Sequence, residues 1–233
     1  MGLTLEVGAL ASLLDEDAAS AAAARLEAQF EAVNRALSAA GLPPHHEPRD
    51  LAPDKRWSGD MYGYSGVHYL RRIAAYVAAG RSLPRPGDDG ASDDPVLGAY
   101  FAVVEGRAPS LFGRMLRRPH PARAFDHLIV HSDAEGFYLP LEFRDVLLPD
   151  EELEIDGGMI GSSPMLLREC ERLATVLHIP PDVTPDSDEL VDAAESQGEG
   201  KGYLRYGVEV FTCVQLREAA RRSVETGAAL VFS

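Results

Sequence analysis

The sequence predicts an α+β fold, in which a small, mostly antiparallel sheet is packed by about five or six helices. Two observations lead to this prediction. The spacing of apolar residues changes between a period of two and a period of 3.6 along the chain, and the strand-like segments fall near the start, in the middle and at the end. A length of 233 residues is enough for one large core. We therefore expect one domain that spans residues 1–233.

The first elements are a short strand and a long helix. Residues 3–7 alternate between apolar and polar side chains, which is typical of a half-buried strand. Residues 12–40 have apolar side chains at steps of three and four, which predicts a helix. Two prolines within 41–44 end this helix because proline cannot donate a backbone hydrogen bond. A polar, aromatic loop is expected over 45–65.

Two helices and two loops are predicted in the next part of the chain. A helix is expected over 66–79, and a flexible loop rich in Gly, Pro and Asp over 81–93. Asp94 has the character of an N-cap, with Pro95 at the first helical position of a third helix. Five arginines within 107–123, interrupted by Pro119 and Pro121, predict a second flexible loop, the one basic segment of the chain.

The middle of the sequence predicts a β-hairpin. Residues 127–131 include two β-branched side chains, 132–136 have the composition of a turn, and 137–141 are again apolar. Pro140 favours an edge position for the second strand, because an edge strand has one side without hydrogen-bond partners.

Three helices and a final strand complete the prediction. A helix is expected after Ser162, Ser163 and Pro164, which are suited to its N-terminus. A short acidic helix is expected over 186–195, where Asp186 and Glu189 have the spacing of a capping box. The last helix is expected over 208–226, followed by a strand over 228–232.

The charge of the chain excludes some classes of function. Its 37 acidic and 22 basic residues leave a formal net charge of −15, so we expect no binding of nucleic acid, which requires Lys and Arg. The charge is consistent with solubility, and also with a surface that attracts a basic partner. Two cysteines, and the lack of an apolar run of membrane-spanning length, predict a cytoplasmic protein without membrane contact.

A group of histidines and carboxylates around the predicted hairpin is one candidate site. On a strand, His127 and His131 would point to the same side, with Asp133 and Glu135 on the adjoining turn. Such groups can bind a divalent metal, with His127, His131 and Asp133 as ligands, or act as catalytic acid and base, with His131, Asp133 and Glu135. The alternative is that the histidines flank a buried strand and the carboxylates stabilise the turn.

An aromatic segment between residues 57 and 69 is the second candidate site. Exposed aromatic side chains bury a large area on binding with little loss of entropy, so they favour contact with a partner. A loop that only covers the core would contain such residues as well. The candidate partner-binding residues are Trp57, Asp60, Tyr62, Tyr64, His68 and Tyr69.

No cofactor is expected from the glycine-containing segments 157–163 and 196–202. The second has Gly-Glu-Gly-Lys-Gly, which lacks the spacing and the hydroxyl residue of a phosphate-binding loop. The first does not follow the dinucleotide-binding pattern, and ordinary helix capping accounts for it.

Four segments resemble blocks of an uncharacterised bacterial cytosolic protein family, which implies a bacterial origin but no activity, ligand or residue role. They are DMYGYSG at 60–66, HSDAEGFYLP at 131–140, GMIGSS at 158–163 and ESQGEG at 195–200. In size and acidity the chain is also similar to immunity proteins of bacterial toxin systems.

The sequence therefore predicts a non-enzymatic binding protein with a protein partner, of the immunity type, that neutralises a basic toxin or effector. The alternative is a small metal-dependent hydrolase that uses the His/Asp/Glu group. Oligomeric state and the identity of the partner are not determined by the sequence.

Overall fold

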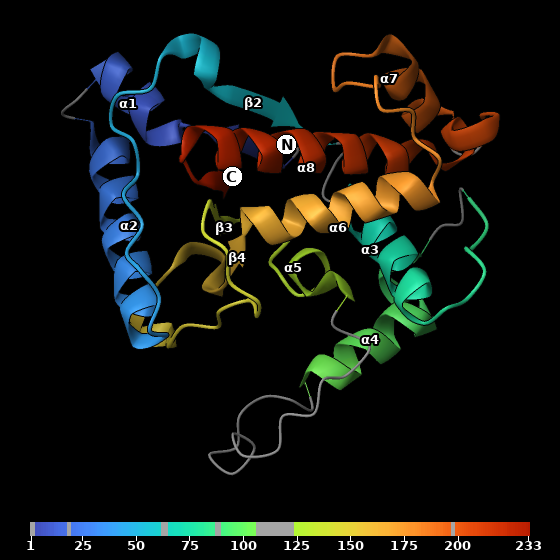
Figure 1. Ribbon diagram of the computed structural model, residues 1–233, viewed down its shortest axis with the longest axis horizontal. Helices are drawn as coiled ribbons and strands as arrows, with labels where there is room; N and C mark the ends of the chain where they lie inside the picture. Colours follow the sequence, from blue (N-terminus) through green and yellow to red (C-terminus); the bar gives the residue numbers. More distant parts are fainter. Residues whose placement is uncertain (1–2, 18–19, 62–64, 87–89, 106–123, 197–198) are drawn as a thin grey trace.

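The computed structural model describes residues 3–17, 20–61, 65–86, 90–105, 124–196 and 199–233. It shows an α+β fold, with eight α-helices and a five-stranded mixed sheet in these residues (Figure 1). The helices are α1 (Ala9–Asp17), α2 (Ala21–Ala39), α3 (Ser65–Ala78), α4 (Pro95–Glu105), α5 (Asp126–Ile129), α6 (Ser163–Val176), α7 (Asp188–Glu195) and α8 (Gly207–Thr226).

The sheet has the strand order β2-β1-β5-β3-β4. All neighbouring strands are antiparallel except β3 and β4, which are parallel. The two chain ends therefore pair in its centre, because β1 and β5 are neighbours. The strands are β1 (Thr4–Val7), β2 (Trp57–Asp60), β3 (Gly136–Leu139), β4 (Ile160–Ser162) and β5 (Leu230–Phe232).

Alternate side chains of the strands enter two separate cores. Leu5, Tyr138 and Leu230 point to the side that α3, α6 and α8 cover. Phe137 and Val231 point to the other side, where α1 and α2 pack. Figure 1 shows α8 and α6 crossing the middle of the molecule and α2 at its left end. The period of two along each strand thus places helices on both faces of the sheet.

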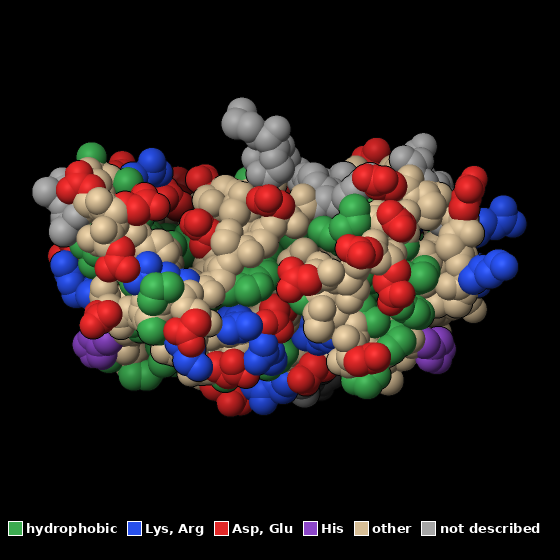
Figure 2. Space-filling model, turned by 90° about the horizontal axis from the view of Figure 1, so that it is seen from above, with side chains coloured by type: hydrophobic (Ala, Val, Ile, Leu, Met, Phe, Trp, Pro, Cys, Tyr) green, Lys and Arg blue, Asp and Glu red, His purple; other side chains and the backbone are tan. Residues whose placement is uncertain are grey.

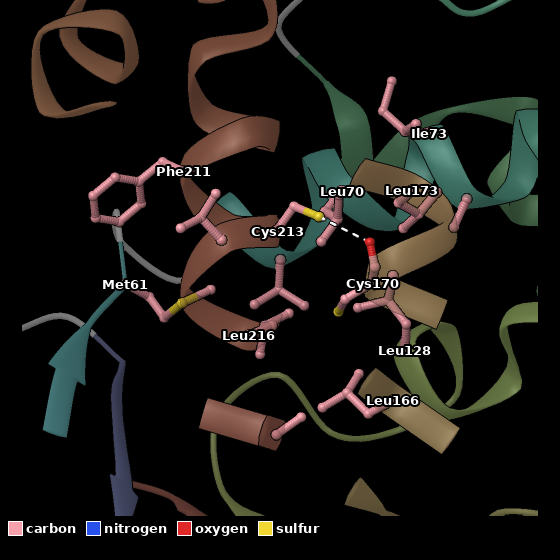
Figure 3. Close-up of a cluster of buried hydrophobic side chains, with 14 of the residues drawn as sticks. Met61, Leu70, Ile73, Leu128, Leu166, Cys170, Leu173, Phe211, Cys213 and Leu216 are labelled. Carbon is pink, nitrogen blue, oxygen red and sulfur yellow. Dashed lines mark hydrogen bonds between the residues drawn. The ribbon is translucent and has the colours of Figure 1, made fainter. Parts of the chain in front are cut away.

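The larger core is closed by the contact between α6 and α8 (Figure 3). Cys170 of α6 and Cys213 of α8 are both free thiols with no exposed surface, and the Cys213 thiol donates to the Cys170 carbonyl oxygen at 3.4 Å. The two cysteines are part of the apolar packing, as their positions on the predicted helices indicated.

Several predicted elements are confirmed. Asp94 caps α4, because its Oδ1 accepts hydrogen bonds from the amides of Val96 at 2.8 Å and Leu97 at 3.3 Å. Ser162 caps α6 and accepts from the amide of Met165. The helices over 66–79, 186–195 and 208–226 are present as α3, α7 and α8, and the first and last strands as β1 and β5.

The predicted long helix over 12–40 is wrong in one respect, since the structure has two helices there. Ser20 begins α2 as its N-cap, and its hydroxyl oxygen accepts from the amide of Ala23 at 3.1 Å. The side chain of Ser20 thus offers the backbone a helix start within an otherwise continuous apolar pattern.

The predicted hairpin is also wrong, because residues 126–129 form the short helix α5 and not a strand. The buried carboxylate of Glu169 accepts from the amide of His127 at 3.2 Å and from that of Leu128 at 2.8 Å. These two hydrogen bonds from a distant helix satisfy the amides at the start of α5, and so override the local preference for a strand.

The edge position predicted from Pro140 is wrong as well. β3 lies between β5 and β4, and its pairing ends at Leu139, so the missing amide of Pro140 is not needed by the ladder. Two strands, β2 and β4, were not predicted. The aromatic loop predicted over 45–65 contains β2, and residues 157–163 contain β4.

The two predicted flexible loops are only partly described. Residues 107–123 lie outside the described residues, and so do 87–89, while 91–93 form a single turn of 3₁₀ helix. No helix in the described part of the chain combines the length and the apolar character needed to cross a bilayer.

Candidate acidic binding face

The longest stretch of sequence without Lys or Arg is also strongly acidic. It lies between Arg172 and Lys201 and contains the helix α7. Every carboxylate side chain in this stretch is exposed. We call these seven residues the α7 acidic face: Asp182, Asp186, Asp188, Glu189, Asp192, Glu195 and Glu199.

The helix α7 turns its carboxylates outward because its apolar residues are needed on the other side. Leu190, Ala193 and Ala194 are buried in the contact with α8. At 3.6 residues per turn, Asp188, Asp192 and Glu195 fall on the opposite side of the helix. Figure 1 shows α7 on the upper side of the molecule, and Figure 2, which views that side directly, shows several acidic side chains over the right half, where α7 lies, and others over the left half.

The spacing of these carboxylates is close to that of phosphates in DNA. With a rise of about 1.5 Å per residue, Asp188 to Glu195 span about 10.5 Å of helix axis. Four carboxylates occur in that length, and the mean axial separation between successive ones is about 3.5 Å. One strand of duplex DNA has one phosphate for about every 3.4 Å of its axis. A protein surface that binds one DNA strand would therefore meet a similar density of negative charge.

The carboxylates of the α7 acidic face have no ion-pair partner among the described residues. In the described residues, none of the seven lies within ion-pair distance of an arginine, lysine or histidine side chain. Other carboxylates of the chain do have arginine partners. These pairs are Asp156 with Arg25, Glu27 with Arg49, Asp15 with Arg56, Glu142 with Arg168, and Glu218 and Glu225 with Arg221.

The pattern of charge on α7 disfavours the helix itself. Asp188 and Asp192 are four residues apart, and Asp192 and Glu195 three, so both are pairs of like charges on neighbouring positions. Glu195 lies at the C-terminal end of α7, where the helix dipole favours a cation, and no basic residue occurs in the last turn. Helix stability therefore does not account for Asp192 and Glu195, whereas Asp188 and Glu189 lie in the first turn, where the helix dipole favours carboxylates.

Two contacts hold α7 in place against the rest of the molecule. A Cβ atom added to Gly207 would lie 1.9 Å from the carbonyl oxygen of Ala193, so only glycine permits this approach of α7 to the start of α8. The hydroxyl group of Tyr203 donates to Glu189. Burial, the contact with Glu189 and the charge of Asp182 together raise the pKa of Tyr203 to about 12.

A second acidic run surrounds the 3₁₀ helix η5 (Glu151–Leu153). Asp150, Glu151 and Glu152 are exposed. The run lies beside α2, since Gln29 donates to the carbonyl oxygen of Glu154 at 3.0 Å. α2 and α7 are at opposite ends of the molecule in Figure 1. The η5 run therefore offers a matched set of carboxylates far from the α7 acidic face.

The predicted aromatic site is divided between two elements. Trp57 and Asp60 lie on the edge strand β2, and Asp60 accepts from the Thr4 hydroxyl at 3.1 Å. His68 and Tyr69 lie half-buried on α3. Tyr62 and Tyr64 are outside the described residues. Contact of these side chains with a partner stays a prediction.

The predicted His/Asp/Glu group does not converge on a common point. His127 is on α5, where its Nδ1 accepts from the Ser162 amide at 3.0 Å and its Nε2 lies 3.1 Å from the Arg144 carbonyl oxygen. Asp133 contacts His68 at 2.6 Å and Glu135 is exposed. No group of three His, Cys, Asp or Glu side chains suited to a metal occurs in the described residues.

The two ring nitrogens of His131 are also occupied by the backbone. Nδ1 lies 3.0 Å from the carbonyl oxygen of Ser132, and Nε2 lies 3.0 Å from that of Phe137. The ring stacks on Tyr138 with 3.9 Å between centroids. Complete burial lowers the pKa of His131 to about 4. His131 is packed in the interior, although the strand that the alternative interpretation placed beside it is the helix α5.

The sequence prediction included the total negative charge but did not identify the segment 173–200 as its most acidic part. The signal was present as the 28 residues between Arg172 and Lys201, which contain seven carboxylates and no basic side chain. The acidic helix predicted over 186–195 is present as α7, but it begins at Asp188 with Ser187 as its N-cap, so the predicted capping box of Asp186 and Glu189 is wrong.

Comparison with known proteins gives one match. A family model described as "Putative DNA-mimic protein" matches residues 1–232. No curated protein matches the chain, and no solved structure does.

This match overturns both functions that the sequence predicted. The description of the family names DNA mimics, and neither toxin-immunity proteins nor metal-dependent hydrolases. It suggests DNA-binding proteins as partners in place of a toxin or effector, while the predicted protein partner with a basic surface is compatible with the match. The resemblance to an uncharacterised family holds, while the likeness to immunity proteins was a likeness in size and charge alone.

Proposed function

The chain belongs to this family of DNA-mimic proteins, and on that basis we propose that it is a non-enzymatic binding protein that occupies the DNA-binding surface of a DNA-binding protein through the α7 acidic face. The observation that carries this proposal is the set of seven exposed carboxylates without an ion-pair partner in the described residues.

The electrostatics support α7 as the contacting element. DNA-binding surfaces gain most of their affinity from Lys and Arg side chains placed opposite phosphates. A helix whose successive carboxylates have a mean axial separation of about 3.5 Å presents such a surface with a similar charge density. Because α7 rests on α8 through Leu190, Ala193 and Ala194, its carboxylates are held on a packed element before binding.

The acidic residues that already have an arginine partner suit this role less well, whereas the exposed η5 run has no ion-pair partner in the described residues and is the comparison for the test below. Arg25 and Arg56 already neutralise Asp156 and Asp15, and a partner would have to displace these arginines. The net charge of −15 still contributes, since it accelerates the encounter with a cationic surface at low salt. A bacterial cytoplasm, the location expected from the sequence, is where such a protein would meet its partners.

The test is competition with DNA. Duplex DNA is immobilised on beads and loaded with the DNA-binding proteins of a lysate of the source organism at about 0.15 M salt, an ionic strength at which contacts beyond about 8 Å are screened. Purified protein is then added in increasing amounts, and each released protein is identified and quantified by mass spectrometry. We expect one or a few DNA-binding proteins to be released.

Two triple variants distinguish a specific contribution of the α7 acidic face from the effect of total negative charge. The test variant carries Asp188→Asn, Asp192→Asn and Glu195→Gln, which changes the net charge by three. The control carries Asp150→Asn, Glu151→Gln and Glu152→Gln in the η5 run, with the same change in net charge. We expect the test variant to require at least tenfold more protein for release and the control to behave as the unmodified chain. Equal release by both variants contradicts the proposal, because total negative charge alone would then be sufficient to release the DNA-binding protein.

A further inference from the structure

An exposed apolar side chain lies within the α7 acidic face. Among the described residues, the large hydrophobic side chains with the most exposed surface are Leu148, Val191 and Val224. Val191 belongs to α7 and is 44% exposed. It is the one of the three that belongs to the α7 acidic face, whereas Leu148 lies two residues before the η5 run.

The position of Val191 follows from the helix geometry. Residues three and four apart are neighbours on a helix surface, so Val191 lies between Asp188 and Glu195, with Asp192 beside it in sequence. Val191 is not part of the packed core, which takes Leu190 from this helix. A partner that covers the three carboxylates must therefore also cover Val191.

Helix stability does not favour a valine at position 191. Valine has lower helix propensity than alanine because its branched side chain loses rotamer freedom, and an exposed position gives it no packing in return. Two alanines, Ala193 and Ala194, occupy the buried side of the same helix. Val191 lies at the border of the charged surface, with Asp188 and Glu195 as neighbours on one side and the buried Ala194 on the other.

We propose that Val191 is the apolar contact of the α7 acidic face, and that it selects partners whose cationic surface includes an apolar side chain. This inference rests on the proposed function, since it concerns the same face. The carboxylates supply long-range attraction to many DNA-binding proteins. Val191 adds a contact that depends on shape and on exclusion of water, so it favours those partners in which the cationic groups surround an apolar site.

The test uses the same release from DNA beads, with the protein amount that gives half release as the measured quantity. For Val191→Ala we expect the amount to rise about fourfold, the effect of removing nearly half of a valine surface from an apolar contact. Val191→Ile retains the contact and is expected to act as the unmodified chain. Val224→Ala, at a residue of α8 that is 42% exposed, is the matched control and is expected to have no effect.

The salt dependence distinguishes the apolar contact from an indirect electrostatic effect. Burial of apolar surface is not screened by ions, whereas attraction between charges is. Val191→Ala should therefore raise the protein amount needed for half release by the same factor at about 0.05 M and about 0.3 M salt. The factor for the triple α7 variant should decrease as the salt concentration increases.

The two proposals fail in different ways. If the triple α7 variant needs more protein for half release and Val191→Ala does not, the inference on Val191 is wrong and the proposed function stands. If the triple α7 variant and its η5 control release equally, the proposed function is wrong. Circular dichroism of Val191→Ala checks that α7 is retained, as expected from the higher helix propensity of alanine.

Discussion

Acid should destabilise the protein through one buried histidine, His131. Its ring is only 2% exposed and is enclosed between the backbone of the turn after α5 and the ring of Tyr138. Burial opposes the charged form, and the nearby charge of Arg71 does so as well, while the carbonyl oxygens of Ser132 and Phe137 favour it. The net effect is a pKa lowered from the ordinary value of 6.5 to about 4.

The size and the sign of the effect follow from this pKa. Between pH 4 and 6.5 the unfolded chain binds a proton on His131 and the folded chain does not, so the free energy of unfolding decreases as the pH falls through this range. A decrease of about 2.5 in pKa, at about 1.36 kcal/mol each, corresponds to roughly 3 kcal/mol. This contribution is fully present above about pH 7 and is lost progressively toward pH 4.

The assay is urea unfolding at a series of pH values between 4 and 8, followed by circular dichroism. Other groups also titrate in this range, so the measured quantity is the difference between the unmodified chain and His131→Phe. Phenylalanine keeps a ring against Tyr138 but cannot bind a proton. His46→Gln, at an exposed position, serves as the control.

We expect the unmodified chain to lose roughly 3 kcal/mol more than His131→Phe between pH 7 and pH 4. Equal pH dependence of the two proteins would refute the reasoning. A gain of stability on acidification, relative to His131→Phe, would also refute it, because it would mean that a charged ring donates to both carbonyl oxygens in the folded state.

Three further predictions concern packing and helix capping. Gly207→Ala places a Cβ atom against the carbonyl oxygen of Ala193; we expect about 1–3 kcal/mol lower stability in urea and faster hydrogen exchange in α7. Ser20→Ala removes the N-cap of α2 and should cost about 1 kcal/mol, measured in the same way, whereas no change would mean that α2 begins elsewhere. Glu169→Gln replaces a carboxylate that accepts from two amides of α5; we expect a loss of about 1–3 kcal/mol, and an unchanged value would contradict the role of Glu169 in forming α5.

The sequence predicted the parts of this protein in which local chemistry decides. Asp94 and Ser162 cap helices because their side chains reach amides only two or three residues away, and such contacts depend on little else. The apolar spacing of α6 likewise required one buried side of this helix, whereas the central parts of α3 and α8 are buried all round. The strongly negative charge was also visible at this level.

Tertiary structure decided what depends on contacts between distant residues. The carboxylate of Glu169 turned a strand-like segment into α5, more than forty residues away along the chain. The pairing of β1 with β2 and β5 set the order of the sheet, which no local pattern encodes.

The distribution of charge was decided in the same way. The sequence determined by itself that this chain is acidic, since that is a matter of composition. Which carboxylates face an arginine and which face solvent depends on how α7 packs against α8, through Leu190 and the close approach at Gly207. The α7 acidic face is therefore a property of the fold, because burying one side of a helix exposes the other.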